Sequence, residues 1–482
     1  MNFKLCFRTA GTVLLILSGL LMLPLLCGLI YHESVWNFVI VAALCAGLGL
    51  LFRLIKPSSN EMFAKEGFFT VGLSWTLMSL LGALPLFISR EIPNYASSFF
   101  ETVSGFTTTG SSIVTDVESL SRCGAFWRMF THWVGGMGML VFMMAIQPKS
   151  RENSMHVMRA EVPGPVVGKL VPRISTTARI LYLIYIGITL LETIMLMLGG
   201  VSFYEALLHS FSTVGTGGFS TRGDAIAGFH SAYVEYVISI FMLVCAVNFN
   251  LYFLALTGRF KIAVKSEELH VFLGLVAAVT LVIALGITKI YGSFGEAFRI
   301  ALFQVAAIIS TTGFSNRNFL AWPGYTKSII VMLMFIGGCA GSTGGGMKLS
   351  RVMMVVKGVY ADLKEILSPR SVTPVRLEGK RIDKSSVKAA YTYFILYMLL
   401  ILVTGLLISV DGFDSQVNYS AALTAMSNVG PGLADMIGPM GNFAAFSGFS
   451  KVVLAICMLF GRLEIYAMII LFSPTMWKSV KR

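Results

Sequence analysis

The sequence predicts an all-α polytopic membrane protein in which four pseudo-repeats surround one central pore, with two extra helices at the N-terminus. Only 13% of the 482 residues are charged and the mean hydropathy is +0.78, whereas a soluble domain carries roughly 25% charged residues. Apolar runs of about membrane-spanning length recur along the chain. A short strip rich in Ser, Thr and Gly recurs four times between them.

Ten apolar runs approach the roughly 20 residues that a helix needs to cross a bilayer. Lys4 and Arg8 precede the first run as in a signal peptide, but no small-residue cleavage site follows and the next run begins at once. We therefore expect a retained helix, and the first two runs form the extra N-terminal pair. The runs cover residues 12–31, 35–55, 67–89, 126–147, 179–199, 232–257, 271–290, 328–356, 390–410 and 451–472.

The basic residues predict the orientation in the membrane. With the N-terminus in the cytosol, the inner segments hold 27 of the 37 Lys and Arg residues, an excess typical of cytoplasmic loops. This bias accounts for the net charge of +13, so we expect a lipid bilayer and no nucleic acid as partner, and both termini in the cytoplasm. The acidic outer residues either attract cations or belong to ordinary solvated loops: Glu33, Glu91, Glu101, Asp116, Glu118, Glu205, Asp224, Glu296, Asp411, Asp414 and Asp435.

The sequence does not indicate an enzyme. The seven cysteines include no CxxC pair, and the six histidines include no HExxH motif and no Cys/His cluster. We therefore expect no disulfide framework, no metalloenzyme site and no organic cofactor.

Four outer loops share one pattern, in which about ten semi-apolar residues lead into Ser, Thr and Gly and end at a glycine. Ten residues are too few to span a membrane, so each stretch is expected to form a re-entrant half-helix. Each repeat is then helix, half-helix, glycine strip, helix. The four loops are FFETVSGFTTTGSS (99–112), LHSFSTVGTGGFST (208–221), FQVAAIISTTGFSN (303–316) and LTAMSNVGPGLADM (423–436).

The glycine strips predict an ion pathway. Non-helical backbone at membrane depth is tolerated only where it lines a water-filled cavity or is buried in protein. Four strips that enter from one side can meet on one axis, where carbonyl oxygens replace the hydration shell of an ion. Glycine permits restricted backbone angles and close approach, and neutral oxygens suit potassium as the transported substrate. Alternatively, each strip is a simple turn between membrane helices.

The strips SGFTTTG, FSTVGTGGFS, STTGFS and NVGPGL resemble the four filter loops of the Trk/Ktr/HKT superfamily of potassium transporters. The extra helix pair and the stretch IGGCAGSTGGGMK resemble its TrkH-type membrane subunits. This resemblance covers nearly the whole chain and implies potassium uptake across the bacterial cytoplasmic (inner) membrane. It also implies that Gly110 favours potassium over sodium. It places the filter oxygens on Thr108, Thr109, Gly110, Thr216, Gly217, Gly218, Thr311, Thr312, Gly313, Gly430, Pro431 and Gly432.

Two features inside the membrane bear on gating. The stretch FIGGCAGSTGGGMKLSR (335–351) interrupts the eighth run, and its spacing is one residue too long for a phosphate-binding P-loop. The resemblance implies a blocking loop over 336–347, with Gly341, Gly344, Gly345, Gly346 and Lys348 as gating residues; a glycine kink for close helix packing is the alternative. In FGRLEIY (460–466), it implies that Arg462 is an electrostatic barrier below the filter. Glu464 either neutralises a cation on a neighbouring helix, such as Lys348, or belongs to an ion pair with a purely structural role.

These elements predict five segments: the N-terminal pair (1–60) and pore repeats 1 to 4 (61–150, 151–262, 263–365 and 366–482). The basic segments 148–178 and 348–388 form a cytoplasmic surface that suits lipid head groups or a soluble partner. The resemblance implies a homodimer on a nucleotide-binding regulatory subunit of the TrkA type. A secondary transporter that couples potassium to sodium or protons is the rival function, but such proteins use broken helices from inverted repeats, whereas all four strips here lie on one side.

Overall fold

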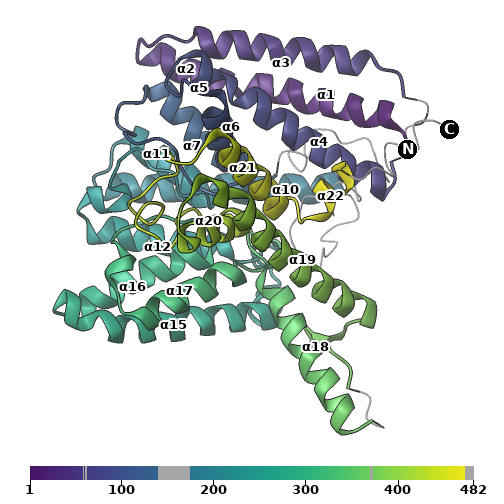
Figure 1. Cartoon of the computed structure of the whole chain (residues 1–482), viewed down its shortest axis with the longest axis vertical. Helices are drawn as coiled ribbons and strands as arrows, with labels where there is room; N and C mark the ends of the chain where they lie inside the picture. Colours follow the sequence, from purple (N-terminus) through teal and green to yellow (C-terminus); the bar gives the residue numbers. More distant parts are fainter. Residues whose placement is uncertain (58, 60–61, 139–173, 370–372, 473–482) are drawn as a thin grey trace.

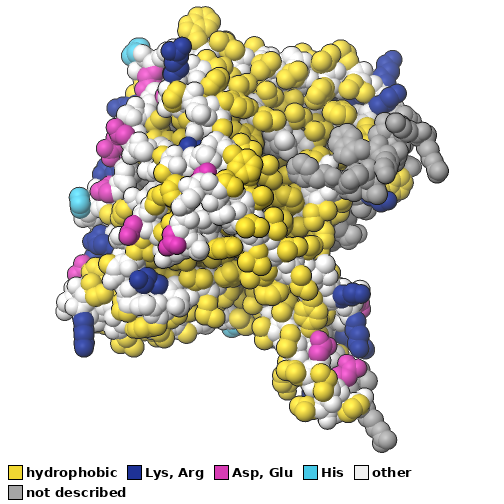
Figure 2. Space-filling view, viewed as in Figure 1, with side chains coloured by type: hydrophobic (Ala, Val, Ile, Leu, Met, Phe, Trp, Pro, Cys, Tyr) yellow, Lys and Arg dark blue, Asp and Glu magenta, His cyan; other side chains and the backbone are white. Residues whose placement is uncertain are grey.

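The computed structural model describes residues 1–57, 59, 62–138, 174–369 and 373–472, and this part of the chain is almost entirely helical (Figure 1). Six of its helices are long and apolar enough to cross a membrane, and α12 (Ala232–Ala246) with α13 (Phe249–Leu256) makes a seventh candidate. Figure 2 shows a broad hydrophobic band over the middle of the visible face, with charged side chains gathered towards its two sides. The predicted all-α polytopic membrane fold is confirmed.

Four copies of one three-helix unit follow the N-terminal helices. Each unit begins with a long helix: α4 (Ala64–Gly82), α10 (Ile174–Leu198), α15 (Glu267–Tyr291) or α19 (Lys384–Ile408). A short helix follows: α6 (Tyr95–Phe106), α11 (Phe203–Val214), α16 (Phe294–Ile309) or α20 (Ser415–Ser427). After the glycine strip, the unit ends with α7 (Arg122–Gly136), α12, α17 (Gly324–Ile336) or α21 (Gly448–Arg462).

The short helices begin where the sequence supplies a capping side chain. An Asn, Ser or Asp oxygen accepts a hydrogen bond from an amide of the first turn, which satisfies a donor that has no partner inside the helix. The caps are Asn94, Ser202, Ser293 and Asp414. These polar caps start the short helices shortly after the long helices end.

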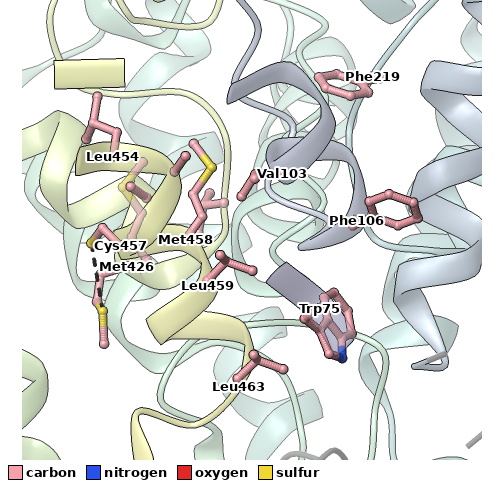
Figure 3. Close-up of a cluster of buried hydrophobic side chains, with 14 of the residues drawn as sticks. Trp75, Val103, Phe106, Phe219, Met426, Leu454, Cys457, Met458, Leu459 and Leu463 are labelled. Atoms are coloured by element: carbon pink, nitrogen blue, oxygen red, sulfur yellow. Dashed lines mark hydrogen bonds between the residues drawn. The ribbon is translucent and has the colours of Figure 1, made fainter. Parts of the chain in front are cut away.

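The units close into a ring because the last helix of each unit packs against the short helix of the next. Thus α7 packs on α11, α12 on α16 and α17 on α20, and α21 returns to pack on α6 of the first unit. Figure 3 shows this last contact, where Met458 and Leu459 of α21 lie beside Val103 of α6. The core therefore centres on the short helices, which are surrounded by protein.

The N-terminal helices lie outside this ring. α1 (Phe3–Leu20) packs on α3 (Trp36–Leu54) and α4, and α2 (Met22–Ile30) packs on α7. The Glu33 carboxylate in the α2–α3 connection accepts hydrogen bonds from the amides of Arg122 (2.8 Å) and Cys123 (2.9 Å), at the start of α7. A carboxylate is favoured at a helix N-terminus, so Glu33 fastens the extra pair to the first repeat.

Three predicted spans are broken in the last helix of their unit. The sixth turns by 91° between α12 and α13, the eighth is interrupted between α17 and α18 (Leu349–Leu367), and the tenth breaks between α21 and α22 (Tyr466–Phe472). Only the eighth was predicted to be interrupted, and the prediction of continuous helices over 232–257 and 451–472 was wrong. Asn248 caps the new start of α13, and positive φ angles at Glu464 (+57°) and Ile465 (+61°) break the helix after α21.

Some predictions fall on other parts of the chain. A two-stranded hairpin, β1 (Arg376–Leu377) with β2 (Lys380–Arg381), lies between α18 and α19 and was not predicted. Residues 139–147 of the fourth run, most of the basic segment 148–178 and the boundary at 150/151 lie outside the described residues, as do 370–372 and 473–482.

Candidate functional site

Every short helix ends in the same turn. One residue adopts a left-handed conformation and its amide donates to the carbonyl three residues earlier, which ends the helix in a Schellman-type turn. Asparagine tolerates this conformation, but threonine is β-branched and rarely adopts it, at a cost on the order of 1–3 kcal/mol. The surrounding structure therefore has to hold these residues in place. They are Thr108 (φ +54°), Thr216 (+56°), Thr311 (+61°) and Asn428 (+53°).

Two residues further along each strip, a glycine has positive φ and lies against the next strip. A Cβ atom at each would collide with the carbonyl oxygen that precedes the next strip's glycine, and the fourth strip closes on the first. The four strips therefore form one closed ring, in which only glycine fits. The distances from the added Cβ to the oxygen are 2.1 Å (Gly110 to Gly217), 2.0 Å (Gly218 to Thr312), 1.8 Å (Gly313 to Val429) and 2.8 Å (Gly430 to Thr109).

The fourth strip has a different register from the one that its sequence suggested. We expected Gly430, Pro431 and Gly432 to match the other strips, but Asn428, Val429 and Gly430 occupy the equivalent positions. Proline has no amide proton, whereas the amides of Thr109, Gly217 and Val429 each donate to a carbonyl of their own short helix (2.8, 2.7 and 3.1 Å). The Gly432 amide donates to the Ile437 carbonyl (2.6 Å) in a turn beyond the ring. The tolerance of asparagine for left-handed backbone was the sequence signal that identifies Asn428.

A cavity of about 130 Å³ opens onto the ring and is lined by all four ring glycines. Arg128 and Arg222 also line it, and no acidic residue is among its described lining residues. Their charges are compensated from behind, since Arg128 Nε lies 2.5 Å from Glu101 Oε1 and Arg222 Nε lies 2.9 Å from Glu205 Oε1. Of the two alternatives for the outer acidic residues, the attraction of cations by an acidic lining therefore does not apply to this cavity.

His132, which the sequence did not single out, supports the second strip. It is fully buried on α7, and a Cβ at Gly217 would lie 2.0 Å from its Nδ1 atom. The Ser212 hydroxyl donates to the Phe219 carbonyl (2.7 Å), so His132 Nδ1 donates to the Ser212 oxygen (2.9 Å). The ring of His132 also stacks on Phe219, with centroids 4.2 Å apart. Glycine is needed at 217 because this imidazole fills the space behind it.

The glycine loop 337–348 between α17 and α18 lies directly against two of the strips. The amide of Gly345 donates to Thr311 Oγ1 (2.6 Å). A Cβ at Gly344 would lie 2.7 Å from the Ser310 carbonyl oxygen, and one at Gly345 would lie 2.7 Å from Asn428 Cβ. The small residues therefore allow the loop to press against the bases of the third and fourth strips.

The loop is also fastened to the broken helix of the second repeat. The Cys339 amide donates to the Ala246 carbonyl (2.9 Å), and the Phe249 amide donates to the Gly341 carbonyl (3.0 Å). Within the loop, the fully buried Lys348 amine donates to Ser342 Oγ (3.1 Å) and to the Gly344 carbonyl. The break between α12 and α13 therefore supplies the backbone partners of the interrupted segment.

Arg462 cross-links three repeats below the strips. Its guanidinium donates to the carbonyl of Thr343 in the loop (2.6 Å) and to those of Gly135 (2.7 Å) and Gly136 (2.8 Å) at the end of α7. The side chain is buried. Arg462 thus joins the fourth repeat to the loop of the third repeat and to the first.

Glu464 has a different partner from the one suggested by the sequence. It forms an ion pair with Arg351 on α18, not with Lys348. The Arg351 guanidinium also lies 4.1 Å from the centre of the Tyr393 ring on α19. The break after Arg462 is therefore connected to α18 and α19.

Glu268, in the first turn of α15, holds both ends of the loop and was not predicted. Its Oε1 atom accepts hydrogen bonds from the amides of Ala340 (2.8 Å) and Ser350 (3.1 Å). The Glu378 carboxylate of the hairpin in turn accepts from the amide of Glu268 (3.0 Å). A carboxylate anchored by the hairpin thus closes the base of the loop.

Comparisons with known proteins agree along the whole chain. The family model TrkH, described as "Cation transport protein", matches residues 32–292 and 271–479. The Trk system potassium uptake proteins TrkH of Salmonella typhimurium and Escherichia coli K12 are each 34% identical over 99% of this chain and 100% of their own length. The crystal structure of the potassium transporter TrkH from Vibrio parahaemolyticus superimposes with a TM-score of 0.89 at 32% identity, over 99% of this chain and 100% of that chain.

We expect Glu268→Leu to loosen the loop, because two amides lose a charged acceptor, each such bond contributing about 1.5–3 kcal/mol. Hydrogen exchange of peptides over 338–351, measured by mass spectrometry in detergent, should accelerate at least about tenfold. Glu192→Leu is the control, since Glu192 is fully buried and forms no ion pair among the described residues. Unchanged exchange in Glu268→Leu would contradict the assignment.

Proposed function

The chain belongs to the TrkH family of cation transport proteins, and on this premise we propose that it takes up potassium across the bacterial cytoplasmic membrane through the ring of four glycine strips. The observation that carries this proposal is the closed succession of glycines, each against the carbonyl oxygen of the next strip. Such a ring brings backbone oxygens from four segments to one axis at the centre of an apolar protein.

Ion selection follows from the chemistry of the strips. They contain no charged side chain, so an ion that enters has to exchange water for neutral carbonyl and hydroxyl oxygens. A large, weakly hydrated cation such as potassium loses least in this exchange. The four short helices end at the strips, and their partly negative C-termini favour a cation. The oxygens are assigned to Thr108–Gly110, Thr216–Gly218, Thr311–Gly313 and Asn428–Gly430, the last in place of Gly430–Gly432.

The loop 337–348 and Arg462 form the gate below the filter. In this arrangement the loop covers the bases of two strips, and the cationic Lys348 and Arg462 lie in the path of an emerging ion. Two positive charges in a low-dielectric surrounding oppose a cation. The loop carbonyls of Thr343 and Gly344 accept hydrogen bonds from Arg462 and Lys348, so opening requires that Arg462 release Thr343.

Coupled transport with protons or sodium is the second candidate. Glu192 on α10 favours it, because this carboxyl is fully buried and forms no ion pair among the described residues, and an uncompensated charge there would be expensive. A neutral carboxyl of this kind is a place for a transported proton.

The cytoplasmic side supports the proposed partners. α18 projects from the body of the molecule (Figure 1), and it exposes an apolar stripe that suits the second protomer of a homodimer: Val356, Val359, Tyr360, Leu363, Ile366 and Leu367. A groove of about 620 Å³ between α18, the hairpin and α19 suits a regulatory subunit of the nucleotide-binding TrkA type. Its charged lining residues are Asp362, Glu365, Arg381, Asp383, Lys384 and Lys388.

Uptake of ⁸⁶Rb⁺ by proteoliposomes tests the function directly. Purified protein should accumulate rubidium against unlabelled internal potassium, and external potassium should compete while sodium competes poorly. Imposing an inward proton gradient at zero membrane potential separates the two candidates. A pore predicts no change in uptake, whereas proton symport predicts acceleration that is lost in Glu192→Gln. Empty liposomes give the background, and uptake at background level would overturn the proposal.

Gly110→Ser should weaken selection of potassium over sodium. A Cβ at Gly110 would lie 2.1 Å from the Gly217 carbonyl oxygen and the residue has φ +79°, so the first two strips have to move apart. Strain of about 1 kcal/mol or more should lower the permeability ratio at least about fivefold, measured as the bi-ionic reversal potential. Gly292→Ser is the matched control, because Gly292 has the same φ of +79° but nothing within 4 Å. An unchanged reversal potential in Gly110→Ser would remove the assignment.

Arg462→Ala should raise ion flux. The substitution removes a positive charge from the pathway and leaves the carbonyls of Thr343, Gly135 and Gly136 without their donor. Loss of charged hydrogen bonds of about 1.5–3 kcal/mol each should increase initial ⁸⁶Rb⁺ uptake at least about tenfold. Arg462→Lys keeps the charge but not the planar fork of donors, and should give an intermediate rate. Equal or lower flux in a well-folded Arg462→Ala protein argues against a barrier.

A further inference from the structure

The ring of strips has one seam that the chain does not bridge covalently, between the fourth repeat and the first. At the other three seams, adjoining repeats follow each other in sequence. The unbridged seam is packed by α21 against α6, with Met458 lying beside Val103 (Figure 3). Apolar contacts of this kind are not directional, so they do not set the spacing of the two strips.

A directed chain of hydrogen bonds crosses this seam. The Thr107 hydroxyl donates to the Val103 carbonyl (2.7 Å), so its oxygen accepts the proton of the Thr109 hydroxyl (2.8 Å). Thr109 Oγ1 is then an acceptor for the side-chain amide of Asn428 (3.0 Å). Asn428 of the fourth strip is thereby linked to α6 of the first repeat.

The orientation of the Asn428 side chain follows from its second partner. Nδ2 also donates to the Met458 carbonyl of α21 (3.0 Å), an atom that can only accept. If the amide were reversed, Asn428 Oδ1 would lie against the Met458 carbonyl oxygen, and two acceptors would face each other. Nδ2 therefore occupies this position and donates one proton to Thr109 and one to Met458. Because Asn428 is fully buried, losing either bond leaves an unpaired polar group.

A second side-chain bond reinforces the same seam. The Ser111 hydroxyl donates to the Gly430 carbonyl (2.9 Å). Within the described part of the chain, these are the two side-chain hydrogen bonds that join one strip to another. Among the described residues, the seam that lacks a covalent connection is thus the seam at which side-chain hydrogen bonds join the strips themselves.

We propose that Asn428 is a specificity-determining residue that sets the distance between the fourth and first strips through Thr109, and so the fit of the ring to a potassium ion. This inference rests on the proposed function of the ring as a filter. The bond lies next to the carbonyls of Thr109 and Val429. A small increase in the distance between the two strips there would change how well the ring of oxygens fits potassium or sodium. Asn428 is a positioning residue, because it acts through the strip that it holds.

The test is Asn428→Leu, which keeps side-chain volume and removes both donors. The potassium-to-sodium permeability ratio is measured from bi-ionic reversal potentials in reconstituted protein. It should fall about fivefold, because one neutral hydrogen bond contributes about 1 kcal/mol, which corresponds to a factor of about five. Thr109→Val removes the acceptor and should lower the ratio similarly, whereas Thr109→Ser keeps the hydroxyl and should restore it. The double variant Asn428→Leu/Thr109→Val should be no worse than Asn428→Leu alone, because Asn428→Leu already removes the bond that Thr109→Val removes.

Asn418→Leu is the matched control. Asn418 lies on the same short helix, is 2% exposed, and donates to the Phe413 carbonyl (2.8 Å) away from the strips. It should leave the ratio unchanged. A reduced flux with an unchanged ratio in both Asn428→Leu and Thr109→Val, or fully additive effects of the two, would overturn the inference. If wild-type protein conducts no potassium, the proposed function itself fails, so the two failures are distinguishable.

Discussion

Backbone amides and carbonyls at membrane depth have to find partners inside the protein, and this constraint organises the molecule. The four half-helices satisfy most of their backbone internally, and their Schellman-type turns satisfy part of the rest. The strips beyond these turns then lie with their glycines against the carbonyls of neighbouring strips. The ring therefore keeps the four non-helical segments inside the protein and beside a cavity, which is where such backbone is tolerated at membrane depth.

The same constraint explains why the last helices break below the ring. The loop 337–348 exposes amides and carbonyls, and the break at Ala246–Phe249 supplies partners for Cys339 and Gly341. Arg462 occupies the carbonyls left at the end of α7 and in the loop. The interrupted helices of different repeats thus satisfy each other's backbone groups, so that the loop and the surrounding helices share one set of hydrogen bonds.

Most of the architecture follows from periodicity in the sequence, since apolar runs and four repeated strips predict the fold and the convergence of the glycines. The register of the fourth strip was missed because NVGPGL contains two glycines, and only backbone conformation separates Gly430 from Gly432. The break at Asn248 carries no glycine or proline that would announce it. The roles of His132 and Glu268 depend on contacts across 80 and 72 positions of the chain, which local sequence does not encode.

Although the four strips share one backbone conformation, each is supported by a different partner. Strip one is tied to Asn428, strip two packs on His132, strip three accepts the Gly345 amide at Thr311, and strip four is tied to Met458. A tetramer of identical chains would have to give every strip the same support. A single chain is free to support some strips with side chains and another with the backbone of the loop 337–348. Any displacement of the loop would remove a hydrogen bond from Thr311, so a movement of the loop would reach the ring directly through the third strip.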